Sequence, residues 1–162
     1  MDVNVLLHDI RTVDTEAVAV GFFEDVRPLK GGAGALDWLL CGALSRLVLE
    51  GRLRGAAGEV ALLTSAGKFP AAKVFLIGLG TRGERLPEGL RAAAKAAAAS
   101  LAGAGVHRAA VDLFPLGDVA DEVHVAAVQQ GLREGAGGHS LSVSLLARDA
   151  ASFERMTRAL RP

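Results

Sequence analysis

Several short stretches of this chain are apolar at nearly every position, and they constrain the fold more than any other feature of the sequence. "AVAVGFF" spans residues 17–23, and "VFLIGL" spans residues 74–79. A strand with one face in water alternates apolar and polar residues, whereas a strand covered on both faces stays apolar throughout. The two stretches therefore predict a sheet with helices packed on each face.

Six stretches have strand character, and helical stretches follow most of them. The predicted strands are 3–7, 17–23, 59–64, 73–79, 108–114 and 140–147. The predicted helices are 36–48, 87–101, one that begins at the cap residue Asp118 and ends near residue 133, and 150–160. This order predicts an α/β fold: a three-layer α/β/α sandwich with a mixed, largely buried sheet. A length of 162 residues suits one domain over 1–162.

Three glycines at and just after the end of the fourth predicted strand have the G-x-G-x-x-G spacing of dinucleotide-binding proteins: Gly78, Gly80 and Gly83. In that motif the helix begins among the glycines, so that its first amides meet the pyrophosphate. Here Pro87 places the helix start four residues after Gly83. We therefore interpret the glycines as a tight turn between strand and helix.

A second glycine-rich segment, "PLKGGAGALD" at residues 28–37, directly precedes an amphipathic helical pattern. Free backbone amides and the positive end of a helix suit an anion. Gly31, Gly32 and Gly34 are therefore the predicted ligand-binding residues of a small anion loop. The alternative is a flexible entry loop that lets the helix pack closely, and the sequence leaves both open.

Charge and composition argue against several partners. Lys and Arg number 18 and so do Asp and Glu, so no net charge attracts nucleic acid or an anionic membrane. Tyrosine is absent and aromatic residues make up 4%, which leaves few rings for stacking bases. A single cysteine, and an N-terminus without a basic region followed by an apolar run, favour a cytoplasmic protein without a membrane partner.

Residues with catalytic potential are scattered. Asp121 and His124 lie one helical turn apart and are half of a metal site at most, and a capped helix start is the simpler interpretation. Cys41 has no histidine near it in sequence and is typical of a packed side chain. Trp38 lies off the apolar stripe of its helix and either packs on another element or marks a partner surface.

Four stretches in order resemble the N-terminal domain of the leucyl aminopeptidase (cytosolic aminopeptidase) family, over roughly residues 15–135. They are "AVAVGFFED", "RPLKGGAGALDWLLCGALSRLVLEGRLRGAAGE", "KVFLIGLGTRGE" and "LRAAAKAAAASLAGAGVHRAAVDL". The resemblance implies a macro-domain-like sandwich in which the "GLG" turn is structural. In that family a separate C-terminal domain supplies the lysine, aspartate and glutamate ligands of two divalent metals. No similar stretch occurs here, so the resemblance assigns this chain no catalytic residue, metal or cofactor and no enzymatic activity.

The resemblance leaves several functions open. The first is a free-standing, non-catalytic module that self-associates or binds a protein partner. The second is a macro-like domain that binds a small anionic ligand such as ADP-ribose or a nucleotide, although "FFEDVRP" replaces the asparagine-rich segment of macro domains. The third is the N-terminal part of a metal-dependent aminopeptidase, but a chain from Met1 to Pro162 is more typical of a complete short product. DNA binding, known for some bacterial family members, conflicts with the zero net charge.

Overall fold

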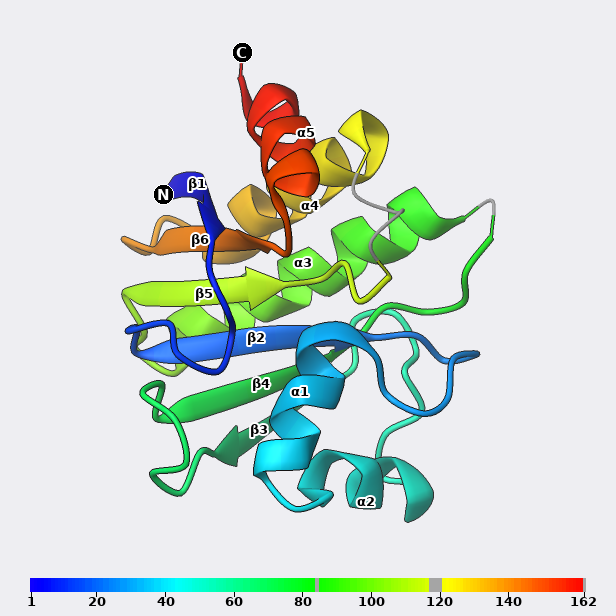
Figure 1. Ribbon diagram of the computed structural model, residues 1–162. Helices are drawn as coiled ribbons and strands as arrows, with labels where there is room; N and C mark the ends of the chain where they lie inside the picture. Colours follow the sequence, from blue (N-terminus) through cyan, green and yellow to red (C-terminus); the bar gives the residue numbers. More distant parts are fainter. Residues whose placement is uncertain (84, 117–120, 162) are drawn as a thin grey trace.

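The apolar stretches form one six-stranded sheet in the computed structural model, which describes residues 1–83, 85–116 and 121–161 (Figure 1). In spatial order its strands are β1 (Asp2–Leu7), β6 (Ser142–Ala147), β5 (Arg108–Asp112), β2 (Ala17–Phe22), β4 (Lys73–Gly78) and β3 (Val60–Thr64). Neighbouring strands are parallel except for β3, which is antiparallel to β4. The sheet is therefore mixed, as the sequence predicts.

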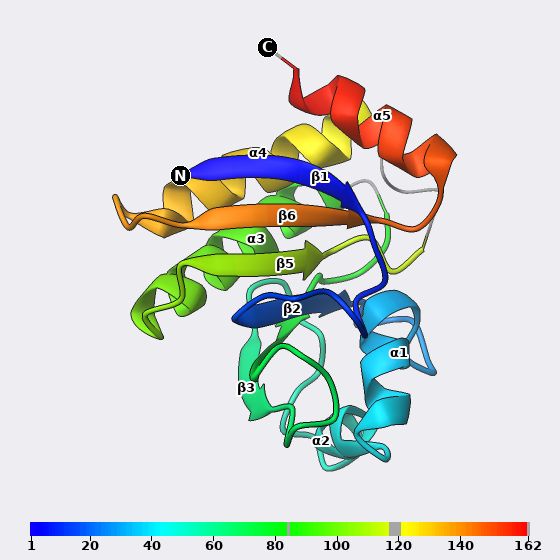
Figure 2. The same ribbon diagram turned by 60° about the vertical axis from the view of Figure 1, so that its left-hand side comes forward.

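Helices cover the sheet on both faces (Figure 2). The helices on one face are α3 (Leu86–Gly103), α4 (Glu122–Ala136) and α5 (Ala150–Leu160). The helices on the other face are α1 (Gly31–Leu39) and α2 (Ala43–Leu49). This arrangement confirms the predicted three-layer sandwich.

The central strand β2 shows why its sequence is apolar at every position. All six of its residues are buried. Ala17 and Ala19 belong to the core beneath α3, α4 and α5, whereas Val18 and Val20 belong to the core beneath α1 and α2. Because successive side chains of a strand point to opposite faces, both faces of β2 have to be apolar.

The predicted helix 36–48 is wrong in one respect, because the chain breaks it into α1 and α2. Cys41 and Gly42 adopt left-handed backbone angles, with φ of 54° and 81°. The two helices consequently meet at 110°. The Asp37 carboxylate accepts hydrogen bonds from the amide of Ser45 (3.0 Å) and from its hydroxyl, which ties the end of α1 to the start of α2. Apolar residues continue at helical spacing across this break, so the sequence pattern does not reveal it.

Other helix boundaries differ less from the prediction. Helix α4 begins at Glu122, and Asp121 caps it by accepting a hydrogen bond from the amide of His124. Asp118, where the sequence predicts the start of this helix, lies outside the described residues. Helix α3 carries Pro87 in its first turn as expected.

Helices α3 and α4 pack closely because small residues face each other. A side chain at Gly131 of α4 would collide with the carbonyl oxygen of Arg91 and with the methyl group of Ala94 in α3. Gly135 stands in the same relation to Lys95 and Ala98, one turn further along. The alanine-rich pattern of α3 therefore serves helix-on-helix contact as well as contact with the sheet.

No single helix in the described residues has the length and apolar character needed to cross a membrane, and only the bent pair of α1 and α2 together reaches both.

Candidate functional site

A cavity of about 500 Å³ opens at the carboxyl ends of the parallel strands. Its walls come from residues 7–11 after β1, from the first turns of α1, from the end of β5 and from residues 146–148 after β6. Figure 1 shows α1 in front of this edge of the sheet. Ligand sites of open α/β sheets commonly lie at this edge, because the strands end there and the helices that follow point their amino ends toward it.

Asp112 is the buried polar group of the cavity, at the end of β5. Its carboxylate accepts hydrogen bonds from the amide of Gly32 in α1 (2.9 Å) and from the amide of Phe114 (3.1 Å). Burial raises the pKa of this carboxyl, while the nearby Arg148 guanidinium and the two amides act in the opposite direction. Asp112 therefore joins the sheet to the amino end of α1.

Arg148 also lines the cavity. Its guanidinium donates a hydrogen bond from Nη2 to the carbonyl oxygen of Phe114 (2.9 Å). It also lies where a side chain at Gly31 would project, and Gly31 has a φ of 60° that favours glycine. The guanidinium of this exposed residue is next to the first turn of α1.

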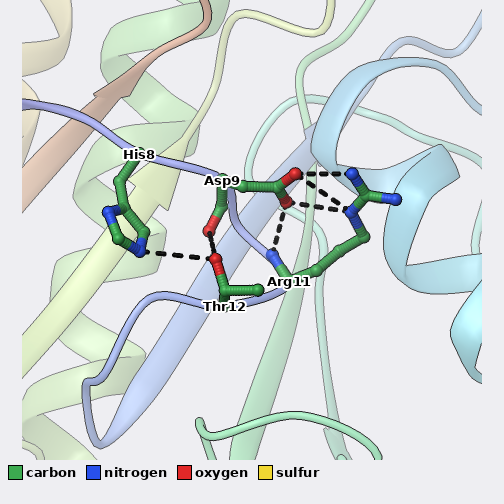
Figure 3. Close-up of polar contacts among 4 residues, drawn as sticks. All are labelled: His8, Asp9, Arg11 and Thr12. Atoms are coloured by element: carbon green, nitrogen blue, oxygen red, sulfur yellow. Dashed lines mark hydrogen bonds and ion pairs between the residues drawn. The ribbon is translucent and has the colours of Figure 1, made fainter.

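An ion pair in the turn after β1 also lines the cavity (Figure 3). The Arg11 guanidinium donates from Nε to Oδ1 of Asp9 at 2.9 Å and also contacts Oδ2, and the Arg11 amide donates to Oδ1. These hydrogen bonds lower the pKa of Asp9 to about 2. In the same turn His8 Nε2 lies 3.4 Å from the Thr12 hydroxyl.

The structure places the predicted anion-loop glycines in two different surroundings. Gly31 and Gly32 line the cavity, but the amide of Gly32 donates to Asp112. Gly34 lies outside that lining, and its amide donates to the carbonyl oxygen of Lys30 (3.2 Å). Gly34 instead lines a second hollow, together with Asp37 and Trp38. Anion binding by the three glycines stays a prediction.

The turn at Gly78 and Gly80 has the geometry of a structural turn. The Gly78 amide donates to the carbonyl oxygen of Glu59 (2.8 Å), and the Gly80 amide donates to that of Gly55 (2.7 Å). Helix α3 begins only at Leu86, after the third glycine of the motif. Because these amides already have backbone partners, they are not aimed at a phosphate.

The other candidate residues that the sequence analysis singled out lie outside the lining of the cavity. His124 Nδ1 is 2.7 Å from Oδ1 of Asp121 at the start of α4. Among the residues that the structure describes, no three His, Cys, Asp or Glu side chains are placed to hold a metal ion together. Cys41 is exposed rather than packed, and Trp38 is 85% exposed.

Sequence reasoning missed the charged residues of the cavity: Asp9, Arg11, Asp112 and Arg148. One signal was present, because Asp112 is the one acid in the otherwise apolar stretch "AAVDLF". An acid at the end of a buried strand indicates a functional or structural polar contact at the sheet edge. For the others the signal is their position directly after β1 and β6, which depends on strand boundaries.

The strand order, the two helical layers and the cavity at the carboxyl edge define a macro-domain-like α/β/α sandwich. Solved structures agree with this class. The chain superposes on a leucine aminopeptidase mutant from tomato with a TM-score of 0.72 at 18% identity, covering 98% of this chain and 35% of that one. It superposes on a macrodomain from Trypanosoma brucei, solved in complex with ADP, with a TM-score of 0.70 at 15% identity, covering 99% of this chain and 69% of that one. At these identities the likeness concerns the fold.

The sequence identifies the family. Residues 19–136 match the model of the "Cytosol aminopeptidase family, N-terminal domain". A probable cytosol aminopeptidase of Geobacter sulfurreducens is 35% identical over 136 residues, which cover 83% of this chain and 27% of the relative. The chain belongs to the cytosol aminopeptidase family, where it corresponds to the N-terminal domain. The match spans about a quarter of the length of that relative, and it leaves the catalytic domain outside.

Proposed function

We propose that this chain is a non-catalytic interaction module of the cytosol aminopeptidase family, which acts by self-association or by binding a protein partner. The observation that carries the proposal is the exposure of large apolar side chains on consecutive helices. Trp38 of α1 is 85% exposed and Leu49 of α2 is 87% exposed. Exposed aromatic side chains that lie beside concave surfaces are typical of protein interfaces.

Membership of this family supports a non-catalytic role for the chain. The match falls on the N-terminal domain, and the peptidase chemistry that the resemblance implies belongs to a different domain. The alternative is that the chain works as the N-terminal part of a metal-dependent aminopeptidase. In that case the surface of α1 and α2 serves the assembly of a longer enzyme.

Light scattering and a peptidase assay test this function. The pure chain is sized over a range of concentrations, and release of leucine from a leucyl substrate is measured with manganese or zinc added. The proposal expects assembly, or binding of an added partner, without leucine release. Metal-dependent release of leucine by the pure chain would overturn it.

A second function, binding of a small anionic ligand, is favoured by the charges around the cavity. Arg11, Arg148 and the first turn of α1 all line this cavity. Guanidinium groups and the amino end of a helix both attract phosphate oxygens. One protein of the same fold, the Trypanosoma brucei macrodomain, is described in complex with ADP.

Calorimetry with ADP-ribose, ADP and NAD decides on this second function. If the cavity binds one of them, Arg148→Gln weakens binding strongly, because it removes charged donors next to Gly31. Arg158→Gln, on helix α5 and outside the cavity lining, is the matched control and leaves binding unchanged. The absence of heat with all three ligands removes this function and leaves the interaction module untouched.

A further inference from the structure

Strand β3 ends the sheet on the side of α2 (Figure 1). In the described part of the chain its one neighbouring strand is β4, and its other edge has no strand beside it. The outer edge of such a strand presents backbone N–H and C=O groups that another strand can bind. The edge of β3 is also separate from the cavity at the strand ends, with which it shares no lining residue.

The hydrogen bonds just outside the two ends of β3 show which of its backbone groups face outward. The Ser65 amide donates to the carbonyl oxygen of Ala72 (3.0 Å), and the Glu59 carbonyl accepts from the amide of Gly78 (2.8 Å). In an antiparallel pair every second residue bonds to the neighbouring strand. Residues in phase with Glu59 and Ser65 therefore bond to β4, and the residues between them direct their amides and carbonyls away from the sheet. These outward-facing residues are Val60, Leu62 and Thr64.

The side chains of β3 lack the features that usually keep an edge strand single. Charged side chains and proline protect many natural edge strands, but the sequence "VALLT" contains neither. Leu62, at the centre of the strand, is 53% exposed. Phe75, which lies opposite Leu62 on β4, is buried. An uncharged strand with an exposed central leucine suits an apolar strand as its neighbour and offers no cation to a phosphate.

The strand is complementary to a second copy of itself. Its five residues have Leu62 at the centre, so a twofold axis there places two β3 strands antiparallel with their outward-facing residues opposite each other. Leu62 then lies opposite the partner's Leu62, and Val60 lies opposite the partner's Thr64. Outward-facing residues paired in this way exchange both backbone hydrogen bonds. On the other face of the sheet, the larger Leu63 lies opposite the smaller Ala61 of the partner.

The opposite edge of the sheet suits β3 less well. Strand β1 begins with the charged Asp2 and also carries Asn4, both exposed. A contact between β3 of one copy and β1 of the next leaves one edge free on each copy and continues into an open array. A contact between two β3 strands closes after two copies. The sequence of β3 therefore favours a dimer with twofold symmetry.

We propose that β3 pairs with β3 of a second copy of this chain, so that the two sheets join into one continuous sheet across a twofold axis at Leu62. This inference rests on the proposed interaction function, and it names the partner and the strand that binds it. Five residues from each copy form a small interface. We therefore expect a dimer that dissociates on dilution.

Light scattering of the whole chain over a range of concentrations tests the dimer. The mass of the wild-type protein should approach about twice the monomer mass at high concentration. Leu62→Lys places two ammonium groups at the axis and should weaken dimerisation about tenfold or more. Leu62→Glu should do the same, and an equimolar mixture of the two variants should dimerise again because opposite charges meet. Val123→Lys adds the same charge at an exposed apolar residue of α4 and is the matched control, which should dimerise as the wild type does.

Amide hydrogen exchange locates the contact. The amides of the three outward-facing residues should exchange more slowly at concentrations where the dimer forms than at high dilution. The amides of Ala61 and Leu63 should be protected at both concentrations, because they bond to β4. Circular dichroism and urea unfolding of each variant establish that it is folded before its mass is compared with that of the wild type.

Several results would overturn the pairing. If Leu62→Lys dimerises as the wild type does while Trp38→Ala does not, self-association uses the surface of α1 and α2, and the interaction function stands without the β3 contact. A mass that keeps growing with concentration indicates a head-to-tail array and contradicts the symmetric pair. A chain that stays monomeric at every concentration contradicts the pair as well, and the interaction function then depends on binding of an added partner.

Discussion

The Asp112 carboxylate at the end of β5 lies 2.9 Å from the amide nitrogen of Gly32, in the first turn of α1. A side chain at position 32 would place its Cβ 2.6 Å from Oδ2 of Asp112. The hydrogen bond therefore depends on glycine at this position, and the two residues form one unit that seats α1 on the sheet.

A double-mutant cycle measures this unit. Asp112→Ala leaves two buried amides without acceptors and is expected to lower the free energy of unfolding by about 2–4 kcal/mol. The added methyl group of Gly32→Ala collides with the Asp112 carboxylate, and the substitution is expected to lower the free energy of unfolding by about 1–3 kcal/mol. Asp112→Ala removes the carboxylate with which the methyl group of Gly32→Ala collides. The free energy of unfolding of the double variant should therefore fall by less than the sum of the two single effects, and the difference should be about 1 kcal/mol or more. Additive costs from urea unfolding would contradict the contact.

The pH dependence of stability reports the burial of Asp112. Folding raises the pKa of this carboxyl above its unfolded value of about 3.9. Its contribution is consequently fully present below that pH and is lost as pH rises through the raised pKa. Relative to Asp112→Asn, the wild-type protein should therefore lose stability as pH rises above about 4 and through the raised pKa. A constant or growing wild-type advantage over this range would mean that burial does not dominate.

The Asp9–Arg11 pair predicts the opposite shift. Hydrogen bonds with Arg11 lower the pKa of Asp9 to about 2, so its contribution to stability is present above about pH 4 and is lost as pH falls toward about 2. Both side chains are roughly half exposed, so solvent screens the pair and its effect on stability is small. Carboxyl NMR titration is the sensitive measurement. In Arg11→Gln, the Asp9 midpoint should rise toward its ordinary value of about 3.9, and an unchanged midpoint would refute the side-chain pairing.

Contact between α3 and α4 can be tested with two glycines of different surroundings. Gly131→Ala drives a methyl group into the backbone of α3 and should lower the free energy of unfolding by about 1–3 kcal/mol. Gly103→Ala, at the end of α3, meets nothing within 4 Å. It should be neutral or stabilising by up to about 1 kcal/mol through helix propensity. Equal effects of the two substitutions in urea unfolding would argue against the close helix contact.

Much of the sandwich follows from the sequence, because strands buried on both faces leave a pattern that few other structures produce. The predicted strand 73–79 is observed as Lys73–Gly78, and the predicted helix 150–160 is observed as α5 with the same bounds. The break at Cys41 and Gly42 was not predictable from periodicity, because apolar residues continue at helical spacing on either side of it.

The candidate site was less accessible to sequence reasoning. Gly31 and Gly32 were found through their position before a helix, and the structure places both in the cavity wall. Arg148 is far from Asp9 and Arg11 in sequence, and the three residues line one cavity because β1 pairs with β6. No local sequence pattern shows which strands pair. These charged residues can therefore be recognised as one site only once the strand order of the sheet is known.

That pairing has a consequence for how the protein is made. Residues 2–7 leave the ribosome well before residues 142–147, the strand with which they pair. At ordinary rates of synthesis the interval is on the order of ten seconds. During this time the apolar side chains of residues 2–7 have no partner strand. For that time the nascent chain therefore depends on factors that keep residues 2–7 from associating with other nascent proteins.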